Sequence, residues 1–181
     1  MVNYNKFARQ YRTLSRKTRA SGKKDPLYST IGDIRDKKLL DVGCGAGTDA
    51  KIFSAMGAKV WGVDIAKKQI KLARKEGMGT FVVGTMTRLP FKNNSFDIVV
   101  SRYAIQSSRN TRKSMQEMMR VAKPNSEIII LAKHPLRTFL EGYINNKKIN
   151  YFKKGAVTSY LFSRKIKLSE PNISFIIILR V

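Results

Sequence analysis

A short apolar run, Lys38–Val42, is followed at once by three alternating glycines, Gly43, Gly45 and Gly47. Such a run bounded by glycine predicts a buried strand. Glycine lets the backbone turn sharply and lets a ligand approach without meeting a Cβ atom. The helix predicted next, over 48–56, would offer the free N–H groups of its first turn to ligand oxygens. The segment therefore limits the chain to α/β folds that carry a ligand site after a strand.

Hydrophobic periodicity continues this alternation through the central part of the chain. Further strands are predicted over 59–63, 80–83, 96–100 and 127–132, and further helices over 66–76 and 111–122. Strands that alternate with helices pair in parallel through right-handed crossovers, with helices on both faces of the sheet. The expected fold class is α/β, a doubly wound, mostly parallel, Rossmann-like sheet that binds ligands beyond the carboxyl ends of its strands.

The two ends of the chain are less regular than its centre. We expect a basic helix over 4–19, a helix over 136–143, a polar loop over 145–154 and strands over 157–162 and 173–181. A chain of 181 residues suits one domain with one core. The expected organisation of that domain is a basic helical segment over 1–35, a cofactor-binding core over 36–132 and an acceptor-side segment over 133–181.

An acid follows the second predicted strand. Asp64 ends the segment Val60-Trp61-Gly62-Val63-Asp64, and a carboxylate at that place can accept hydrogen bonds from both hydroxyls of a ribose. An aspartate before a helix can also be no more than a helix cap. Dinucleotide binding is a competing interpretation, but its fingerprint G-x-G-x-x-G requires a third glycine where this chain has Thr48.

Three stretches resemble the class I S-adenosylmethionine-dependent methyltransferases. Residues 41–47, with the pattern Asp-x-Gly-x-Gly-x-Gly, resemble motif I of that family, 84–100 resemble its GDAxxLPFxDxSFDxV stretch, and 118–126 resemble its ExxRVLKPGG stretch. The similarity covers about residues 38–132 and is greatest to the subfamily that methylates small molecules, lipids and quinones. It implies S-adenosylmethionine as the cofactor. It also implies a sheet shortened at its C-terminus, because the family fold closes with two further strands.

The resemblance implies roles for the residues at the carboxyl ends of the first two strands. Asp41, Gly43, Gly45 and Gly47 would line the methionine and ribose parts of the cofactor. Asp64 would hold the ribose hydroxyls.

The same resemblance assigns other residues to the adenine and amino-acid ends of the cofactor. Ile65 and Met86 would flank adenine. Thr85 stands where the family usually has an aspartate that accepts a hydrogen bond from the adenine amino group. Ser101 would lie near the amino-acid moiety.

Catalysis of methyl transfer requires few special side chains. The reaction is an in-line displacement whose leaving group is already activated, so alignment is the main task. A general base is needed only for a protonated, weakly nucleophilic acceptor. His134 is the candidate base, although a solvated loop position is the commoner role for such a residue, and Tyr103 could cover the cofactor or simply pack. Because Cys44 and His134 are the sole residues of their kinds, no metal site of Cys/His type is predicted.

The formal net charge of +24 raises the question of a polyanionic partner. Basic residues outnumber acidic ones in every part of the chain, whereas a dedicated nucleic-acid surface would concentrate them. We therefore expect weak non-specific polyanion binding and favour a small-molecule acceptor over RNA. An RNA methyltransferase and an inactive, shortened fold that acts as a basic binding module remain open alternatives.

Hydropathy gives no indication of a membrane protein. No apolar run approaches the roughly 20 residues that a membrane-spanning helix requires, and no secretory signal opens the sequence. The expectation is a soluble, cytoplasmic protein.

Overall fold

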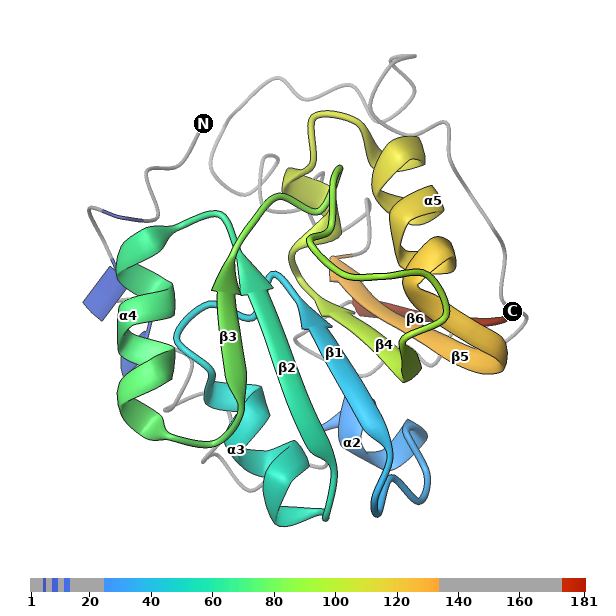
Figure 1. Ribbon diagram of the computed structural model, residues 1–181, viewed down its shortest axis with the longest axis horizontal. Coiled ribbons are helices and arrows are strands. Elements are labelled where there is room, and N and C mark those ends of the chain that lie inside the picture. The colour runs from blue at the N-terminus through green and yellow to red at the C-terminus, as the bar shows by residue number, and fades with distance from the viewer. Residues whose placement is uncertain (1–4, 6–7, 10–11, 14–24, 134–173) are drawn as a thin grey trace, which may run out of the picture.

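The computed structural model describes residues 5, 8–9, 12–13, 25–133 and 174–181, and these ranges form one six-stranded sheet with helices on both faces (Figure 1). The strands are β1 (Lys38–Val42), β2 (Lys59–Asp64), β3 (Thr80–Val83), β4 (Phe96–Arg102), β5 (Ala122–Lys133) and β6 (Ser174–Arg180). The helices are α2 (Pro26–Thr30), α3 (Thr48–Ala55), α4 (Lys67–Glu76), the 3₁₀ helix η1 (Ile105–Ser107) and α5 (Thr111–Val121).

The order of the strands in the sheet is β3-β2-β1-β4-β5-β6. Neighbours from β3 to β5 pair in parallel, and β6 is antiparallel to β5. From β1 the chain adds β2 and β3 on one side. It then crosses back and adds β4 and β5 on the other side of β1. This reversal between β1 and β4 is a topological switch point, where open α/β sheets bind their ligands. The predicted doubly wound, mostly parallel fold is confirmed.

Two hydrophobic cores lie on the two faces of the sheet. Because neighbouring side chains of a strand point to opposite faces, Leu39 joins Phe53 and Ile70 under α3 and α4. Leu40 joins Met118 and Val121 of α5 on the other face. Figure 1 shows α4 beside the β3 edge and α5 toward the opposite edge of the sheet.

Most central elements have the bounds that the sequence predicts. The predicted and observed bounds are the same for β1 and β3 and differ by one residue at one end for β2, α3 and α4. The helix α2 lies within the segment expected to be helical over 1–35, but its bounds were not predicted, although Asp25 and Pro26 carry a helix-start pattern. The Asp25 side chain accepts a hydrogen bond of 3.0 Å from the N–H of Leu27, and Pro26 opens the helix.

The boundary between α5 and β5 differs from the prediction. The sequence predicts that the helix runs to 122, with a break at Pro124-Asn125 before the strand, whereas the helix ends at Val121 and β5 begins directly at Ala122. Pairing with the neighbouring strand explains this, because Ala122 pairs with Phe96 and the N–H of Ser95 donates to the carbonyl of Val121 at 2.8 Å. The register then shifts before Ile98.

The strand predicted over 173–181 is confirmed as β6, whose Ile178 pairs with Ile129 of β5. The elements predicted over 136–143, 145–154 and 157–162, and most of the helix predicted over 4–19, lie outside the described residues. Among the helices that the structure does describe, none has the length and apolar character needed to cross a membrane.

Candidate active site

The loops that follow β1 and β4 meet at the switch point. Gly43 has a φ of +82°, and a Cβ atom on it would lie 2.2 Å from the Cβ of Ala104, so the loop after β4 leaves no room for a side chain there. The N–H groups of Gly43 and Cys44 both donate to the carbonyl of Val63, at 2.8 and 3.1 Å. The glycine segment is thereby held across the carboxyl ends of β1, β2 and β4.

Gly45 borders open space. Its φ is +54°, a left-handed conformation that favours glycine, and a Cβ built on it would have no atom of the other described residues within 4 Å, its two chain neighbours aside. Gly47 differs, because its Cβ would lie 3.1 Å from the Cβ of Ala73 and 3.2 Å from the ring of Phe81. Of the three predicted glycines, Gly45 is therefore the one whose bare backbone faces a space that a ligand can enter, and this fits a cofactor laid across the loop.

The carboxylate of Asp64 joins this loop to the start of α4. Its Oδ2 accepts a hydrogen bond of 2.9 Å from the N–H of Gly45, and its Oδ1 accepts one of 2.8 Å from the N–H of Ala66. Burial raises the pKa of Asp64, although these N–H groups and that of Ile65 act in the lowering direction. A carboxylate offers about four acceptor positions, so hydroxyl donors of a ligand can still be accepted. The structure brings the two predicted motifs together.

The three residues predicted at the adenine end lie in the loops after β2 and β3. Ile65 is 68% exposed, the highest fraction among the exposed large apolar side chains that the structure describes, so its side chain is accessible to a flat apolar ligand. Met86 is half-buried against the α5 core. The hydroxyls of Thr85 and Thr87 share a hydrogen bond of 3.0 Å. The adenine contacts themselves remain predictions.

Asp41 and Ser101 are fully enclosed at the ends of β1 and β4, with exposures of 1% and 0%. The hydroxyl of Ser101 donates to the carbonyl of Val42 at 3.1 Å, which ties the two strands together. Cys44 is also buried, and burial together with the Asp41 carboxylate raises the pKa of its thiol well above the ordinary value. A thiol so protonated is a poor nucleophile. The cofactor contacts assigned to Asp41 and Ser101 remain predictions.

Of the two candidate catalytic residues, Tyr103 lies directly after β4. Its φ is +50°, which is uncommon for a residue other than glycine, and such backbone strain is found most often at functional sites. Its N–H donates to the carbonyl of Leu131 at 2.7 Å, and its ring centroid is 5.7 Å from the guanidinium carbon of Arg102. His134 lies outside the described residues. Both catalytic roles remain predictions.

A buried ionic cluster that the sequence analysis missed lies at the carboxyl end of β4. The Arg102 side chain, 6% exposed, binds both carboxylate oxygens of Asp25 at 3.0 and 2.5 Å and lies 3.5 Å from Asp49 of α3. The hydroxyl of Tyr28 donates to the same Asp49 carboxylate. This cluster fastens α2 and the first turn of α3 to the sheet near the glycine loop. The available signal was Arg102 itself, because a charged residue at the end of a buried strand requires a partner.

Glu117 and Arg120 support the segment that leads into β4. Glu117 accepts a hydrogen bond of 2.8 Å from the N–H of Leu89, while Arg120 donates to Glu117 and to the carbonyl of Phe91. The hydrogen bond from Arg120 lowers the pKa of Glu117. Arg120 belongs to the stretch that resembles ExxRVLKPGG, and Glu117, directly before the range 118–126, stands at the place of its acid. In this fold the two side chains hold a loop rather than a ligand.

Comparison with known proteins agrees with this geometry. Residues 40–130, which make up half of the chain, match the family described as "Methyltransferase domain". The chain belongs to this family. It is the class I S-adenosylmethionine-dependent methyltransferase family, of the ubiquinone- and menaquinone-related type, and its cofactor is S-adenosylmethionine.

The relatives are distant and longer than this chain. A demethylmenaquinone methyltransferase of Renibacterium salmoninarum is 29% identical over 58% of this chain and 44% of its own length. The uncharacterized methyltransferase YcgJ of Bacillus subtilis is 30% identical over 79% of this chain and 59% of its own length. The crystal structure of YcgJ, also 30% identical, has a TM-score of 0.57 over 66% of this chain and 54% of that one. The chain spans about half the length of the curated relatives it matches.

Proposed function

We propose that this chain transfers the methyl group of S-adenosylmethionine to a small-molecule acceptor. The observation that carries the proposal is the open space beside Gly45 next to the partly buried carboxylate of Asp64, at the switch point of the sheet. In this arrangement the methionine and ribose parts of the cofactor lie along Gly43–Gly47, beside Asp41 and Ser101.

Asp64 has two tasks in the proposed site. It already fixes the glycine loop to the start of α4 through the N–H groups of Gly45 and Ala66. It also accepts hydrogen bonds from the ribose hydroxyls. Hydroxyl donors favour the charged form of a carboxylate, so they oppose the effect of burial that raises the pKa of Asp64.

The adenine ring is placed between the loops after β2 and β3. The exposed side chain of Ile65 provides an apolar surface for one ring face, and Met86 flanks the ring from the other loop. Thr85 faces the adenine amino group, with a hydroxyl that is a weaker acceptor than a carboxylate.

The chain's contribution to the reaction is alignment. When bound, S-adenosylmethionine supplies a methyl group on a sulfonium whose positive charge activates the leaving group. The glycine loop and Asp64 fix the position of the cofactor, so that an acceptor in the crevice is held in line with the methyl group. Tyr103 closes the crevice beside the loop after β4, and His134 takes the proton of an acceptor that is not already nucleophilic.

A small-molecule acceptor is supported by the relatives. Curated relatives carry names that state a small-molecule acceptor: demethylmenaquinone, norajmaline and ajmaline. The matches of these relatives cover 54–58% of this chain, so the proposal names a class of acceptor and not one compound.

Label transfer tests the proposed function. The protein is incubated with methyl-labelled S-adenosylmethionine and, separately, with a small-metabolite extract and with total RNA, beside the Gly45→Val variant as the control without a cofactor site. We expect label in a small molecule for the native chain and none for the variant. Label at a defined nucleotide of RNA would overturn the acceptor class. Label in neither pool, with cofactor bound normally, would instead support the inactive binding module.

A further inference from the structure

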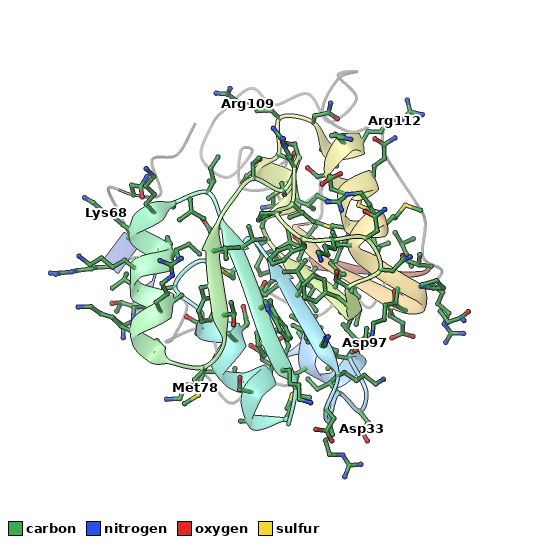
Figure 2. The ribbon with its side chains drawn as sticks, in the orientation of Figure 1. Asp33, Lys68, Met78, Asp97, Arg109 and Arg112 are labelled. Carbon is green, nitrogen blue, oxygen red and sulfur yellow. The ribbon has the colours of Figure 1, made fainter. Side chains whose placement is uncertain are left out.

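The exposed face of α4 carries an unbroken group of cations. All five basic residues of this ten-residue helix have exposed side chains: Lys67, Lys68, Lys71, Arg74 and Lys75. At 3.6 residues per turn they cover roughly a third of the helix circumference. Figure 2 shows Lys68 near one end of α4 and nitrogen-tipped side chains projecting from the outer side of the helix. Five of the 36 basic residues of the chain are therefore gathered on one surface.

This group of cations is unfavourable for the helix itself. Lys67, Lys71 and Lys75 follow one another at i,i+4 spacing, where like charges repel. Lys67 and Lys68 stand in the first turn, which has no acidic residue, although the helix dipole favours anions there. The one acid of the helix, Glu76, is paired with Arg12. An anionic surface against α4 would relieve both kinds of repulsion.

Exposed aliphatic side chains accompany the cations. A shallow, open depression of about 500 Å³ lies along the flank of α4 toward the β3 edge of the sheet, and its lining combines four of the cations with Ile70 and Val83. Val83 on β3 is 42% exposed, and Met78, which follows α4, is 41% exposed. Arg74 is fixed across this flank, because its Nε donates to the carbonyl of Phe81 at 2.9 Å.

The types of side chain on this surface indicate which polyanion it suits, a nucleic acid or an anionic lipid bilayer. Proteins that hold single-stranded nucleic acid stack the bases on exposed aromatic rings. None of the aromatic side chains whose burial the structure describes is exposed. Cations mixed with exposed aliphatic groups are instead suited to the boundary of an anionic lipid bilayer, where lysine and arginine meet the headgroups and aliphatic groups meet the acyl chains.

We propose that α4 docks this protein on anionic lipid membranes, through Lys67, Lys68, Lys71, Arg74 and Lys75, with Val83 beside them and Met78 two residues past the end of the helix. Asp64 and Ile65 directly precede α4, so docking brings the edge of the cofactor crevice close to the bilayer surface. The attachment is peripheral and electrostatic, and it therefore weakens as salt rises. It does not depend on methyl transfer, so it can hold or fail independently of the proposed function.

Vesicle flotation of the full chain tests this proposal. The charge-reversal variant Lys67→Glu/Lys71→Glu/Lys75→Glu is compared with a matched variant that reverses three exposed lysines outside α4, Lys37→Glu/Lys51→Glu/Lys92→Glu. Both variants change the net charge equally, and thermal unfolding checks that both are folded. We expect the native chain to float with phosphatidylserine-rich vesicles at low salt but not with pure phosphatidylcholine vesicles. The α4 variant should bind about a hundredfold more weakly, given the usual contribution of a lysine at an anionic surface, and the matched variant should lose far less.

Val83→Ser and Met78→Ser test the aliphatic part and should each weaken vesicle binding several-fold without changing its salt dependence. Equal losses in the two charge-reversal variants would overturn the proposal, because net charge alone would then explain binding. Equal binding to neutral and anionic vesicles would overturn it as well. So would tighter, α4-dependent binding to duplex RNA than to vesicles, which would assign the surface to nucleic acid.

Discussion

Replacement of Arg102 by methionine should destabilise the fold strongly. The guanidinium is 6% exposed and lies 2.5 Å from Asp25 and 3.5 Å from Asp49, whose side chains are 16% and 8% exposed, so the variant leaves two largely buried carboxylates without their cation. Breaking a buried ion pair by removing one partner costs about 3–5 kcal/mol. In a domain of this size about 1 kcal/mol shifts Tm by roughly 2–4 °C, so we expect Tm to fall by about 6–20 °C.

Thermal and urea unfolding followed by circular dichroism measure this loss. Arg102→Lys is the control for charge, and it should fall between the native chain and Arg102→Met because lysine cannot form the two-point contact with Asp25. The double variant Arg102→Met/Asp25→Asn should be more stable than the sum of the single changes, since it removes one of the uncompensated carboxylates. A loss under about 1 kcal/mol for Arg102→Met, as for an exposed pair, or strict additivity in the double variant would refute the reasoning.

Further predictions concern the crevice and the loop that supports it. Gly45→Val should abolish binding of S-adenosylmethionine in calorimetry and lower Tm by the strain of a valine in a left-handed backbone, whereas Gly43→Ala should also lower Tm because its Cβ would collide with the loop after β4. Asp64→Ala should weaken cofactor binding by about 1.5–3 kcal/mol. If the variant bound the cofactor with unchanged affinity, Asp64 would serve only to link the glycine loop to α4. Glu117 has a pKa below its ordinary 4.5, so its contribution to stability is present above that pH and is lost as pH falls through the lower folded-state value. Glu117→Gln should therefore reduce the acid sensitivity of unfolding, and an unchanged pH profile would contradict the importance of its contact with Arg120.

The central fold was predictable because its elements depend on local patterns. The apolar run before Gly43 and the alternation of strands with helices are read from the sequence directly, and both are confirmed. The start of β5 was not predictable in this way, because Pro124-Asn125 is a typical break. Only pairing with Phe96 extends the strand back to Ala122. Long-range pairing of this kind leaves no local pattern.

The candidate site was predictable in its backbone and less so in its side chains. Motif spacing correctly places Gly45 and Asp64 next to each other, at the carboxyl ends of β1 and β2. The ionic cluster around Arg102 joins residues from α2, α3 and β4, and nothing in the sequence pairs Arg102 with Asp25 across this distance along the chain. The cationic surface of α4, in contrast, follows from helical periodicity in the sequence, because a helix over 66–76 places Ile70 and Ala73 on one side and its lysines on the other.

Isothermal titration calorimetry with S-adenosylmethionine, S-adenosylhomocysteine and a nicotinamide dinucleotide tests the central claim most directly. The account predicts that the native chain binds both S-adenosyl ligands and not the dinucleotide, and that Gly45→Val binds none of the three. Binding of the dinucleotide without binding of S-adenosylmethionine, or undiminished S-adenosylmethionine binding by Gly45→Val, would contradict it.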